Sequence, residues 1–469
     1  MFFSILYYMS QKSSGYSSES ESSEYSQQSS IPDSEPSSIG KDLDFSDLMR
    51  NRIENSDIIN KLLDEPDGSF VCPSNQNLLS SKVLLVKHIG SPSINGEVWQ
   101  SCTFWNCDNN KCSCTNKHTV ALKKIPLTPE AVEHLEDYYY DDVEAMKFDV
   151  FAEIMCMHLC KVLVENNVCP NLPVFFKYYF CEDCKFSNPS LVKYFKHAKM
   201  DQVVCALLLT EYASLGDLKN WLKEKRSVEE WFNMFFQVFV GLYALQKYFD
   251  LTHNDLHWGN VLVHKIKPGG YFKYTIDGTD YYLPNIGLLF VLWDFGYAHI
   301  PNKLEPKPKN ATIKNRLSVD ANRIMKVIDW LPNEYGIDAP KEIIDFVEDY
   351  QRPNVLLHDI FNSYDFDRFR TPPPQNDIIK TFSLDKKIKI GIYEWFLKDR
   401  SLNITSSEES ESQESQKNTK ESFLKECLEK DSLLMDTLAE RLGIKETDRA
   451  RLCEQIVKTF KSENKERNN

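Results

Sequence analysis

The chain has 469 residues, of which 42% are hydrophobic, so it is long and apolar enough to bury a large core. Its formal net charge of −14 argues against nucleic acid as the main partner, because binding a phosphate backbone requires a concentrated basic surface. No apolar stretch approaches the roughly 20 residues that span a bilayer, so no membrane segment is expected. The odd count of 13 cysteines and the lack of a secretory signal argue against a disulfide framework and predict a non-secreted, intracellular protein.

The two ends of the chain differ in composition from its middle. Residues 1–75 form a serine-rich extension that is expected to be largely disordered, because it offers few apolar side chains to offset the entropy of ordering. A run of serine and glutamate over residues 403–422 is typical of a linker, and residues 423–463 show the apolar spacing of a small helical tail. The main folded part is therefore expected between residues 76 and 402.

Within this middle part, the hydrophobic pattern predicts strands first and helices later. Strands are expected at Val83–Lys87 and His118–Ile125, followed by a helix at Phe148–Glu165. Ser227 and Glu230 form a capping-box signature at the start of a long helix, whose apolar residues are expected to be buried. The order of elements predicts a fold of the α+β class.

The segment after this long helix carries the most chemical information. It reads His253-Asn254-Asp255-Leu256-His257-Trp258-Gly259-Asn260, and Asp294-Phe295-Gly296 follows a later apolar run. An aspartate five residues before an asparagine can take the proton of an attacking hydroxyl, so Asp255 is the candidate catalytic base. Asn260 and Asp294 are the candidate ligands of a magnesium ion on nucleotide phosphates. The order and setting of the two motifs favour a phosphotransfer site over two unrelated turns.

These motifs resemble those of protein kinases, and the string Asp-Leu-His-Trp-Gly-Asn resembles the haspin-like kinases in particular. The long insertion 263–287, with a β-hairpin expected at Tyr274–Gly278, is similar to that family as well. Related kinases occur in large cytoplasmic DNA viruses such as iridoviruses, so the resemblance implies a viral protein. It also implies a two-lobed protein kinase fold, with a small β-rich N-lobe with one main helix at 76–213 and a larger, mainly helical C-lobe at 214–402.

The resemblance places the lysine that grips the α and β phosphates of ATP in the predicted strand at 118–125. Ala121 and Lys123 match the Ala-x-Lys core, and strand alternation puts Lys124 on the other face, where it would be a solvated charge. Glu153 is implied as the carboxylate that holds Lys123, and Glu144 is the alternative.

The phosphate-covering loop is implied at residues 90–98. Gly90, Gly96 and Val98 match the family pattern, but the middle glycine is missing and the spacing is one residue too long. A loop that contains Pro92 is stiffer than a glycine-rich one, so a plain hairpin is the alternative interpretation.

The hinge that meets adenine is implied at residues 207–218. Thr210 would be the gatekeeper, and backbone groups from Glu211 to Ala213 would contact the adenine edge of ATP. Asp217 is placed to accept a hydrogen bond from a ribose hydroxyl, and the alternative role of Asp217 is an ordinary helix cap.

The remaining catalytic-loop residues also have implied roles. Asn254 replaces the arginine that usually pairs with a phosphorylated activation segment, so such phosphorylation is expected to be dispensable. His257 stands where a lysine usually faces the transferring phosphate and can donate a hydrogen bond or, when protonated, a charge. His253 is expected to be structural, and Asp320 to brace the catalytic loop.

Five cysteines form a candidate zinc site. Cys107, Cys112 and Cys114 lie in the turn between the second and third predicted strands, and Cys181 and Cys184 form a Cys-x-x-Cys in the turn after the fourth. Both turns are expected at the same end of a kinase small lobe, where four thiolates could hold a structural Zn²⁺. Free thiols in a reducing compartment are the alternative.

The function that this resemblance implies is transfer of the γ-phosphate of Mg-ATP to a serine or threonine of a protein. Haspin itself has a different tripeptide at the position of Asp294-Phe295-Gly296, so its histone substrate is not implied. The alternatives are a small-molecule phosphotransferase with the same Asp-Leu-His-x-x-Asn motif and a pseudokinase scaffold. The expected partners are ATP and a protein substrate, in the host cytoplasm or the virion, and the sequence leaves the oligomeric state open.

Overall fold

The computed structural model describes residues 44–389 apart from internal gaps, the longest of which are 64–82, 136–146 and 305–312. The linker predicted at 403–422 and the helical tail predicted at 423–463 lie outside the described residues. Within the described part, no helix is long and apolar enough to cross a membrane.

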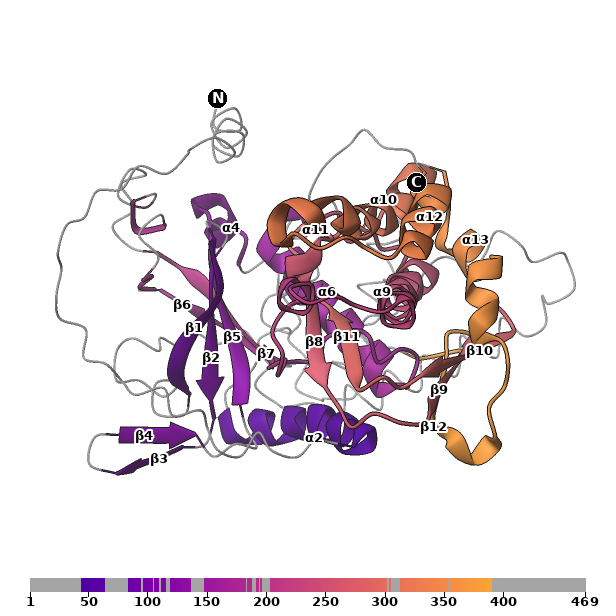
Figure 1. Cartoon of the computed structure of the whole chain (residues 1–469). Helices are drawn as coiled ribbons and strands as arrows, with labels where there is room; N and C mark the ends of the chain where they lie inside the picture. The colour runs from indigo at the N-terminus through magenta and orange to yellow at the C-terminus, as the bar shows by residue number, and fades with distance from the viewer. Residues whose placement is uncertain are drawn as a thin grey trace, which may run out of the picture. The chain divides into compact units, whose positions relative to one another are not determined.

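A five-stranded antiparallel sheet forms the first part of the fold (Figure 1), with the strand order β1-β2-β5-β7-β6. The strands are Leu84–Ser93 (β1), Gly96–Cys102 (β2), Thr119–Pro126 (β5), Phe175–Cys181 (β6) and Cys205–Glu211 (β7). Every residue of β6 and β7 is buried, although β6 is at the edge of the sheet. The strands predicted at 83–87 and 118–125 are confirmed as β1 and β5.

Two helices and a hairpin accompany this sheet. Helix α6, Asp149–Glu165, is the helix predicted at 148–165; it packs against β6 and is buried over most of its length because it is apolar on nearly all sides. The short helix α4, Pro129–Glu133, begins after Thr128, whose side chain accepts a hydrogen bond from the Ala131 amide. The hairpin of β3, Trp105–Asp108, and β4, Lys111–Cys114, lies between β2 and β5 in the chain.

Helix α2, Phe45–Leu63, lies in the extension that was expected to be largely disordered. That expectation does not hold for residues 45–63, because the serine-rich composition ends before them and their apolar face is buried. In Figure 1 this indigo helix runs beneath the five-stranded sheet, and it contacts β6. At its first residue, the ring of Phe45 packs 4.5 Å from the ring of Phe272 and 6.0 Å from that of Phe382.

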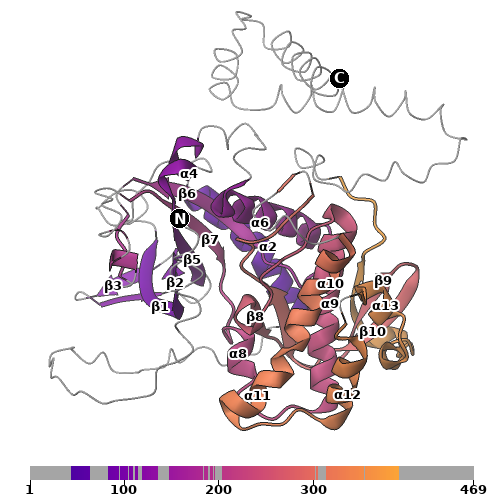
Figure 2. The same ribbon diagram turned by 90° about the horizontal axis from the view of Figure 1, so that it is seen from above.

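The later part of the fold is mainly helical (Figure 2). Helix α9, Val228–Phe249, has the predicted capping box: the Ser227 side chain accepts from the Glu230 amide, and the Glu230 carboxylate accepts from the Ser227 amide. Helix α9 is buried on almost every side, and α10, α12 and α13 pack against it. The other helices are α8 (Leu218–Trp221), α10 (Ile313–Met325), α11 (Val327–Tyr335), α12 (Lys341–Tyr350) and α13 (Leu357–Phe361).

Two small sheets complete the described fold. Strands β8, Val261–Lys265, and β11, Leu288–Leu292, form an antiparallel pair, in which β8 directly follows the segment 253–260 and β11 ends just before Asp294. Strands β9 (Tyr271–Ile276), β10 (Thr279–Pro284) and β12 (Ile378–Ser383) form the second sheet. The predicted hairpin is confirmed: Asp277 and Gly278 between β9 and β10 have left-handed φ values of 49° and 77°, as a two-residue hairpin turn requires.

The strand register shows that the two cysteine-bearing turns leave the sheet at opposite ends. Cys102, the last residue of β2, pairs with Thr119 at the start of β5, whereas Cys205, the first residue of β7, pairs with Pro126 at the end of β5. Seven residue steps of strand separate these two ends, about 23 Å. The expectation that both turns lie at the same end is wrong, because successive antiparallel connections alternate between the ends of a sheet. The hairpin with Cys107, Cys112 and Cys114 therefore begins far from Cys181 and Cys184.

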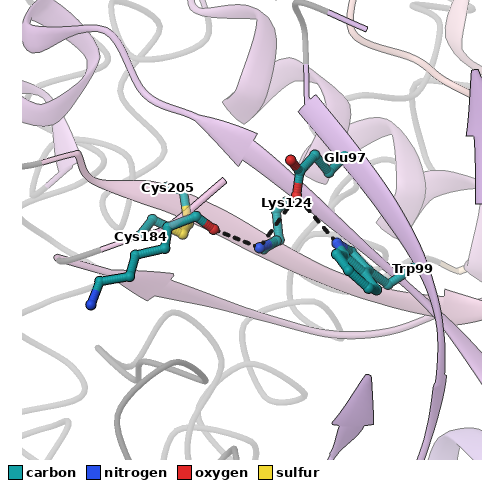
Figure 3. Close-up of a disulfide and its surroundings, with 6 residues drawn as sticks. Glu97, Trp99, Lys124, Cys184 and Cys205 are labelled. Carbon is teal, nitrogen blue, oxygen red and sulfur yellow. Dashed lines mark hydrogen bonds and ion pairs between the residues drawn. A yellow bond between two sulfur atoms is a disulfide. The ribbon is translucent and has the colours of Figure 1, made fainter. Parts of the chain in front are cut away.

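The structure joins Cys184 to Cys205 in a disulfide, with their Cα atoms 5.9 Å apart (Figure 3). Cys205 pairs with Cys181 in the register of β6 and β7, and the Cys184 amide donates to the carbonyl of Val203 (2.9 Å), which brings the turn back against β7. The expectation of no disulfide is therefore wrong for this pair.

Candidate active site

Asp255 lies in the loop between α9 and β8, with 40% of its side chain exposed. The backbone around it is fixed on both sides: its amide donates to Nδ1 of His253 (3.4 Å), and its carbonyl oxygen accepts from Nδ2 of Asn260 (2.9 Å). Partial burial raises the pKa of Asp255 above its ordinary value of 3.8. A carboxylate with a raised pKa is a stronger base, and this one remains accessible to a substrate hydroxyl.

Two buried side chains hold the backbone of this loop. The carboxylate of Asp320 accepts from the amides of His253 (2.7 Å) and Asn254 (2.8 Å), which confirms the expected brace. The ring of His253 donates from Nε2 to the carbonyl of Trp293 (2.8 Å), and burial lowers the pKa of His253 to about 4. The ring is therefore neutral near pH 7 and, as expected, has a structural role: it ties the loop to the segment that carries Asp294.

We expect Asp320→Asn to weaken this brace. An amide offers only one oxygen acceptor, so the amide of either His253 or Asn254 is left without its partner, which costs about 1–3 kcal/mol. Urea unfolding followed by circular dichroism should show this loss, whereas Asp329→Asn on the exposed face of α11 should change the free energy of unfolding by less than about 0.5 kcal/mol. Equal stabilities of the two variants would show that Asp320 is not a brace.

Asn254 and His257 are also held in place by hydrogen bonds within the loop. Asn254 has a left-handed φ of 64°, a conformation that asparagine adopts more readily than most residues, and its Nδ2 donates to the carbonyl of Tyr297 (3.1 Å). The exposed ring of His257 accepts from the Gly259 amide at Nδ1 (3.0 Å). Nδ1 is therefore occupied as an acceptor, and Nε2 is the ring nitrogen that is left to donate a hydrogen bond.

Lys123 is the centre of a buried charge cluster. From β5 its Nζ lies 2.6 Å from Oε1 of Glu153 on α6 and 2.8 Å from Oδ1 of Asp294, which follows β11. The ion pair with Glu153 that the resemblance implied is present. Lys124 points to the other face, as predicted, but it is 6% exposed and pairs with Glu97, so the expectation of a solvated charge is wrong. Glu144 lies outside the described residues.

The charges of this cluster depend on one another. Burial disfavours the ammonium of Lys123, but the carboxylates of Asp294 and Glu153 outweigh it, so the pKa of Lys123 is raised. Burial also disfavours the ionised form of Glu153, and for this acid the effect raises the pKa, to about 7. For Asp294, the attraction of Lys123 exceeds the effect of burial, and the pKa is lowered. At neutral pH the ammonium thus keeps Asp294 ionised, as a metal ligand must be.

Asn260 and Asp294 provide the oxygen donors that Mg²⁺ prefers. The amide of Trp293 donates to the carbonyl of Asn260 (2.9 Å), so the backbones of the two candidate ligands are adjacent. The side-chain NH₂ of Asn260 is directed to the carbonyl of Asp255, which leaves its amide oxygen as the remaining donor atom of that side chain. Asp294 has a left-handed φ of 62° and a side chain that is 34% exposed. The donor set fits a magnesium ion.

In the segment implied as the phosphate-covering loop, β1 and β2 form an antiparallel hairpin in which Ser93 pairs with Gly96. Gly96 has a φ of 148°, and a Cβ there would lie 2.3 Å from the carbonyl oxygen of Lys124, so no other residue fits. Gly90 has a left-handed φ of 79° but open space around it. Val98 pairs with Lys123 across β2 and β5. The structure thus places this hairpin beside Lys123 and explains Gly96 by strand packing.

In the segment implied as the hinge, Thr210 is fully buried in β7, opposite Ala121 of β5. Ala213 is also buried, and its carbonyl accepts from the Gly216 amide (3.2 Å). The Asp217 side chain accepts from the Asn220 amide at the start of α8 (3.2 Å). The alternative role of Asp217 as a helix cap is therefore confirmed, and its ribose contact stays a prediction.

The carboxylate of Glu211 binds Arg52 of α2. The sequence did not predict this role. Arg52 donates from Nε and Nη2 to the two carboxylate oxygens, both at 2.7 Å, and from the same guanidinium to the carbonyls of Pro170 (2.8 Å) and Leu172 (2.5 Å). Nε2 of His264 lies 3.1 Å from the same carboxylate. Although burial acts in the opposite direction, Arg52 and His264 lower the pKa of Glu211 to about 2.

This network joins three distant parts of the chain at the end of β7. Arg52 and Glu211 are 2% and 4% exposed, so both charges are removed from water and each needs the other. The one available signal in the sequence was Glu211 itself, since a carboxylate that ends an apolar strand requires a cation. Its partner lies 159 residues away, and nothing local identifies Arg52.

Comparisons with known proteins agree with this geometry. The model of the haspin-like kinase domain family matches residues 11–327, more than half of the chain. The "Putative serine/threonine-protein kinase" of Acanthamoeba polyphaga mimivirus is 24% identical over 270 residues, which cover 50% of this chain and 56% of that protein. The "Probable serine/threonine-protein kinase" of Invertebrate iridescent virus 6 is 26% identical over 161 residues, which cover 33% of this chain and 28% of that protein.

A similarly named protein of frog virus 3 (isolate Goorha) is 28% identical over 150 residues, which cover 32% of this chain and 17% of the relative. The chain thus spans about half, or less, of the length of the relatives it matches. The family match is broad, and it contains the strand of Lys123, the helix of Glu153 and both catalytic motifs. The chain therefore belongs to the haspin-like kinase domain family.

Proposed function

We propose that the protein is an ATP-dependent protein serine/threonine kinase, which transfers the γ-phosphate of Mg-ATP to a protein hydroxyl. The observation that carries this proposal is the contact of Lys123 with both Glu153 and Asp294. These three residues come from β5, α6 and the segment after β11. The backbone of Asn260 is hydrogen-bonded to Trp293, the neighbour of Asp294, and the side chain of Asn260 is hydrogen-bonded to the carbonyl of Asp255. Phosphoryl transfer needs such positioning and charge more than covalent chemistry.

Each residue then has a defined part in the reaction. Lys123 binds the α and β phosphates, and Glu153 keeps its ammonium in place. Asp255 orients the attacking hydroxyl and accepts its proton, a task for which its raised pKa suits it. Asn260 and Asp294 hold Mg²⁺, which neutralises charge on the phosphates when bound. His257 donates from Nε2 toward the transferring phosphoryl group.

The proposed nucleotide site lies between a β-rich N-lobe and a mainly helical C-lobe. Gly90, Gly96 and Val98 would cover the phosphates, and backbone groups of Glu211 and Ala213 would meet adenine beside Ala121. Asp217 would contact ribose. This assignment follows from the family and from the adjacency of β2, β5 and β7 in the sheet.

A protein substrate is favoured over a small molecule by the family match and by the kinase names of the viral relatives. The same relatives support a viral origin. The host cytoplasm or the virion is the site of action that we propose. We propose no nucleic-acid or membrane partner, in line with the net charge of −14.

The proposal is tested by transfer of labelled γ-phosphate from Mg-ATP to a mixture of generic proteins and to the chain itself. We expect label on serine and threonine, and a fall in kcat of about 10²–10³-fold in Lys123→Met, because a preorganised charge at the phosphates is lost. Glu153, whose pKa is already about 7, can take up a proton in this variant and let it stay folded.

Two matched variants control this experiment. Lys123→Arg keeps a positive charge and should retain more activity than Lys123→Met, whereas Lys223→Met replaces an exposed lysine and should behave as the wild type. Bound ATP without transfer to any protein would favour a scaffold. Transfer to a small alcohol alone would favour a small-molecule phosphotransferase.

A further inference from the structure

A cation that the proposed mechanism does not use lies beside the proposed base, Asp255. Arg323 is on α10, which packs against α9 (Figure 2), and its Nη1 lies 3.9 Å from Oδ1 of Asp255. The side chains of Arg323 and Asp255 are 45% and 40% exposed, so both reach the surface where a substrate hydroxyl must arrive. The residues next to a phosphoacceptor therefore pass close to a guanidinium.

The N–H donors of this guanidinium are unused. A separation of 3.9 Å is too long for a hydrogen bond, so Asp255 does not accept one from Arg323. Among the described residues, Arg323 has no hydrogen-bond acceptor and no other ion pair. By contrast, Arg226, Arg368 and Arg370 each donate to a carbonyl or a carboxylate of the chain. A planar guanidinium with free donors is suited to bind a carboxylate or a phosphate through two hydrogen bonds.

Lys326 adds a second positive charge next to Arg323. The amide of Lys326 donates to the carbonyl of Asn322 (3.2 Å), so the helical backbone of α10 continues to this residue. Residues three apart in a helix are neighbours on its surface, which puts Lys326 beside Arg323. Lys326 is exposed, and in the described part of the chain no carboxylate lies within 4 Å of its ammonium. The two side chains form a small basic surface at the proposed base.

The surrounding sequence is basic as well, although the chain as a whole is acidic. Residues 297–326 contain seven lysines and arginines but only two acidic residues, in a chain with a net charge of −14. One of the two acidic residues, Asp320, is buried, and its carboxylate accepts from two backbone amides. A local excess of positive charge attracts an anionic partner to this part of the molecule.

We propose that the enzyme selects acidic protein substrates, in which a glutamate or an aspartate lies within two residues of the phosphoacceptor serine or threonine. Arg323 binds this carboxylate, and Lys326 attracts acidic residues further along the peptide. An extended peptide advances about 3.3 Å per residue, so a carboxylate one or two residues from the hydroxyl at Asp255 is within reach of Arg323. This inference rests on the proposed kinase function and gives its substrate class.

The phosphoryl transfer itself is the reaction already proposed. The γ-phosphorus of ATP forms a bond to the substrate hydroxyl oxygen, and its bond to the bridging oxygen of ADP breaks. ADP leaves with the electron pair of that bond, and the hydroxyl proton passes to Asp255 and then to solvent. Arg323 binds the substrate beside the acceptor and takes no part in the bond changes, so it determines specificity.

The chain itself contains a sequence of this substrate class. Residues 17–24 read Ser-Ser-Glu-Ser-Glu-Ser-Ser-Glu, with three glutamates and no basic residue. Each serine of this run lies within two residues of a glutamate. These residues lie outside the described part of the structure, so only their sequence is used. A second copy of the chain is therefore a substrate of the proposed kind, and each added phosphate brings more negative charge to the remaining serines.

The test compares two synthetic peptides as substrates of the full chain with Mg-ATP. The first has the sequence of residues 15–26, and in the second glutamine replaces Glu19, Glu21 and Glu24. We expect kcat/KM to be about tenfold higher for the acidic peptide, because hydrogen bonds between charged groups are the stronger ones. Equal values for the two peptides, or a higher value for the glutamine peptide, would overturn the proposal.

Three variants show whether Arg323 is responsible for the preference. Arg323→Gln should lower the ratio of the two kcat/KM values by about fivefold, because a neutral amide lacks the charge that strengthens the bond. Arg323→Lys keeps the charge without the planar fork and should give an intermediate ratio. Arg352→Gln, which replaces another arginine with a side chain that is 65% exposed, should keep the ratio of the wild type. An unchanged ratio in Arg323→Gln, whether or not both rates fall, would contradict the assignment.

A binding measurement separates this inference from the proposed kinase activity. Labelled peptides with alanine in place of every serine cannot accept phosphate at serine, and fluorescence anisotropy gives their Kd for the full chain. We expect the acidic peptide to bind about tenfold more tightly than its glutamine counterpart, with a smaller difference at high salt, because exposed charges are screened. Equal Kd values would reject the acidic-peptide site. A tenfold preference without phosphate transfer to any protein would support this site and reject the kinase activity.

Discussion

Asp255→Asn is expected to reduce kcat for phosphate transfer by about 10²–10⁴-fold and to leave nucleotide binding nearly unchanged. The substitution keeps the size and shape of the side chain but removes its ability to accept a proton. The hydrogen bond from Asn260 reaches the backbone carbonyl of residue 255, and the bond to His253 starts from its backbone amide, so both survive the change. Steady-state kinetics together with nucleotide titration would separate the two effects.

The pH dependence of the wild type gives an independent check. In the proposed mechanism Asp255 acts as a base when ionised, and its pKa is raised above 3.8 in the folded protein. Activity should therefore fall as pH drops through this raised pKa, and the acid limb should be absent from the residual activity of Asp255→Asn. Asp338→Asn, at an exposed position, is the matched control. An unchanged kcat in Asp255→Asn would remove the catalytic base from the proposed mechanism.

Arg52→Met is expected to reduce the free energy of unfolding by about 3–5 kcal/mol. Methionine keeps most of the apolar volume of the side chain but leaves the carboxylate of Glu211 buried without its main cation. Two backbone carbonyls, of Pro170 and Leu172, lose their donors as well. Chemical unfolding at neutral pH would measure the loss. Arg50→Met on the same helix removes an exposed ion pair, with a side chain that is 57% exposed, and should change stability by less than about 1 kcal/mol.

The same variant should show a pH dependence with a defined sign. In the wild type, Glu211 has a folded pKa of about 2 against an ordinary value of 4.5, so its contribution is complete above pH 4.5 and is lost as pH falls through about 2. In Arg52→Met, burial without Arg52 raises the pKa of Glu211, and acidification stabilises this protein by protonating the carboxyl. The difference in free energy of unfolding between the wild type and Arg52→Met should therefore become smaller as pH falls from 7. A constant difference would mean that Glu211 is not the group affected.

The parts of the site that the sequence predicted are those with a local signature. Asp255 and Asn260 share one short loop, Lys123 follows an alanine on a strand, and Glu153 lies within a helix that the apolar spacing locates. Each is fixed by a few neighbouring residues, and the fold then brings Lys123, Glu153 and Asp294 together. The brace by Asp320 was also foreseen, because it follows from the family arrangement once the loop is located.

The parts that escaped prediction depend on register and on contacts between distant segments. Composition describes the serine-rich extension as a whole and does not show that Phe45 starts a helix with a buried face. Lys124 was misjudged because the segment that covers it follows Cys184 and lies far from it in the sequence. Alternation along a strand shows which face a residue is on, but not what covers that face.

Helix α2 changes where the haspin-like kinase domain must start. Sequence composition sets the boundary near residue 76, and a shortened protein that begins there would lack Arg52 while keeping the buried carboxylate of Glu211. It would also expose Phe272 and Phe382, which Phe45 covers. The smallest fragment that keeps the Arg52–Glu211 ion pair and the contacts of Phe45 therefore begins before Phe45, and the family match, which begins at residue 11, already includes it. Part of what composition treats as an appendage is a structural component of the kinase-family domain.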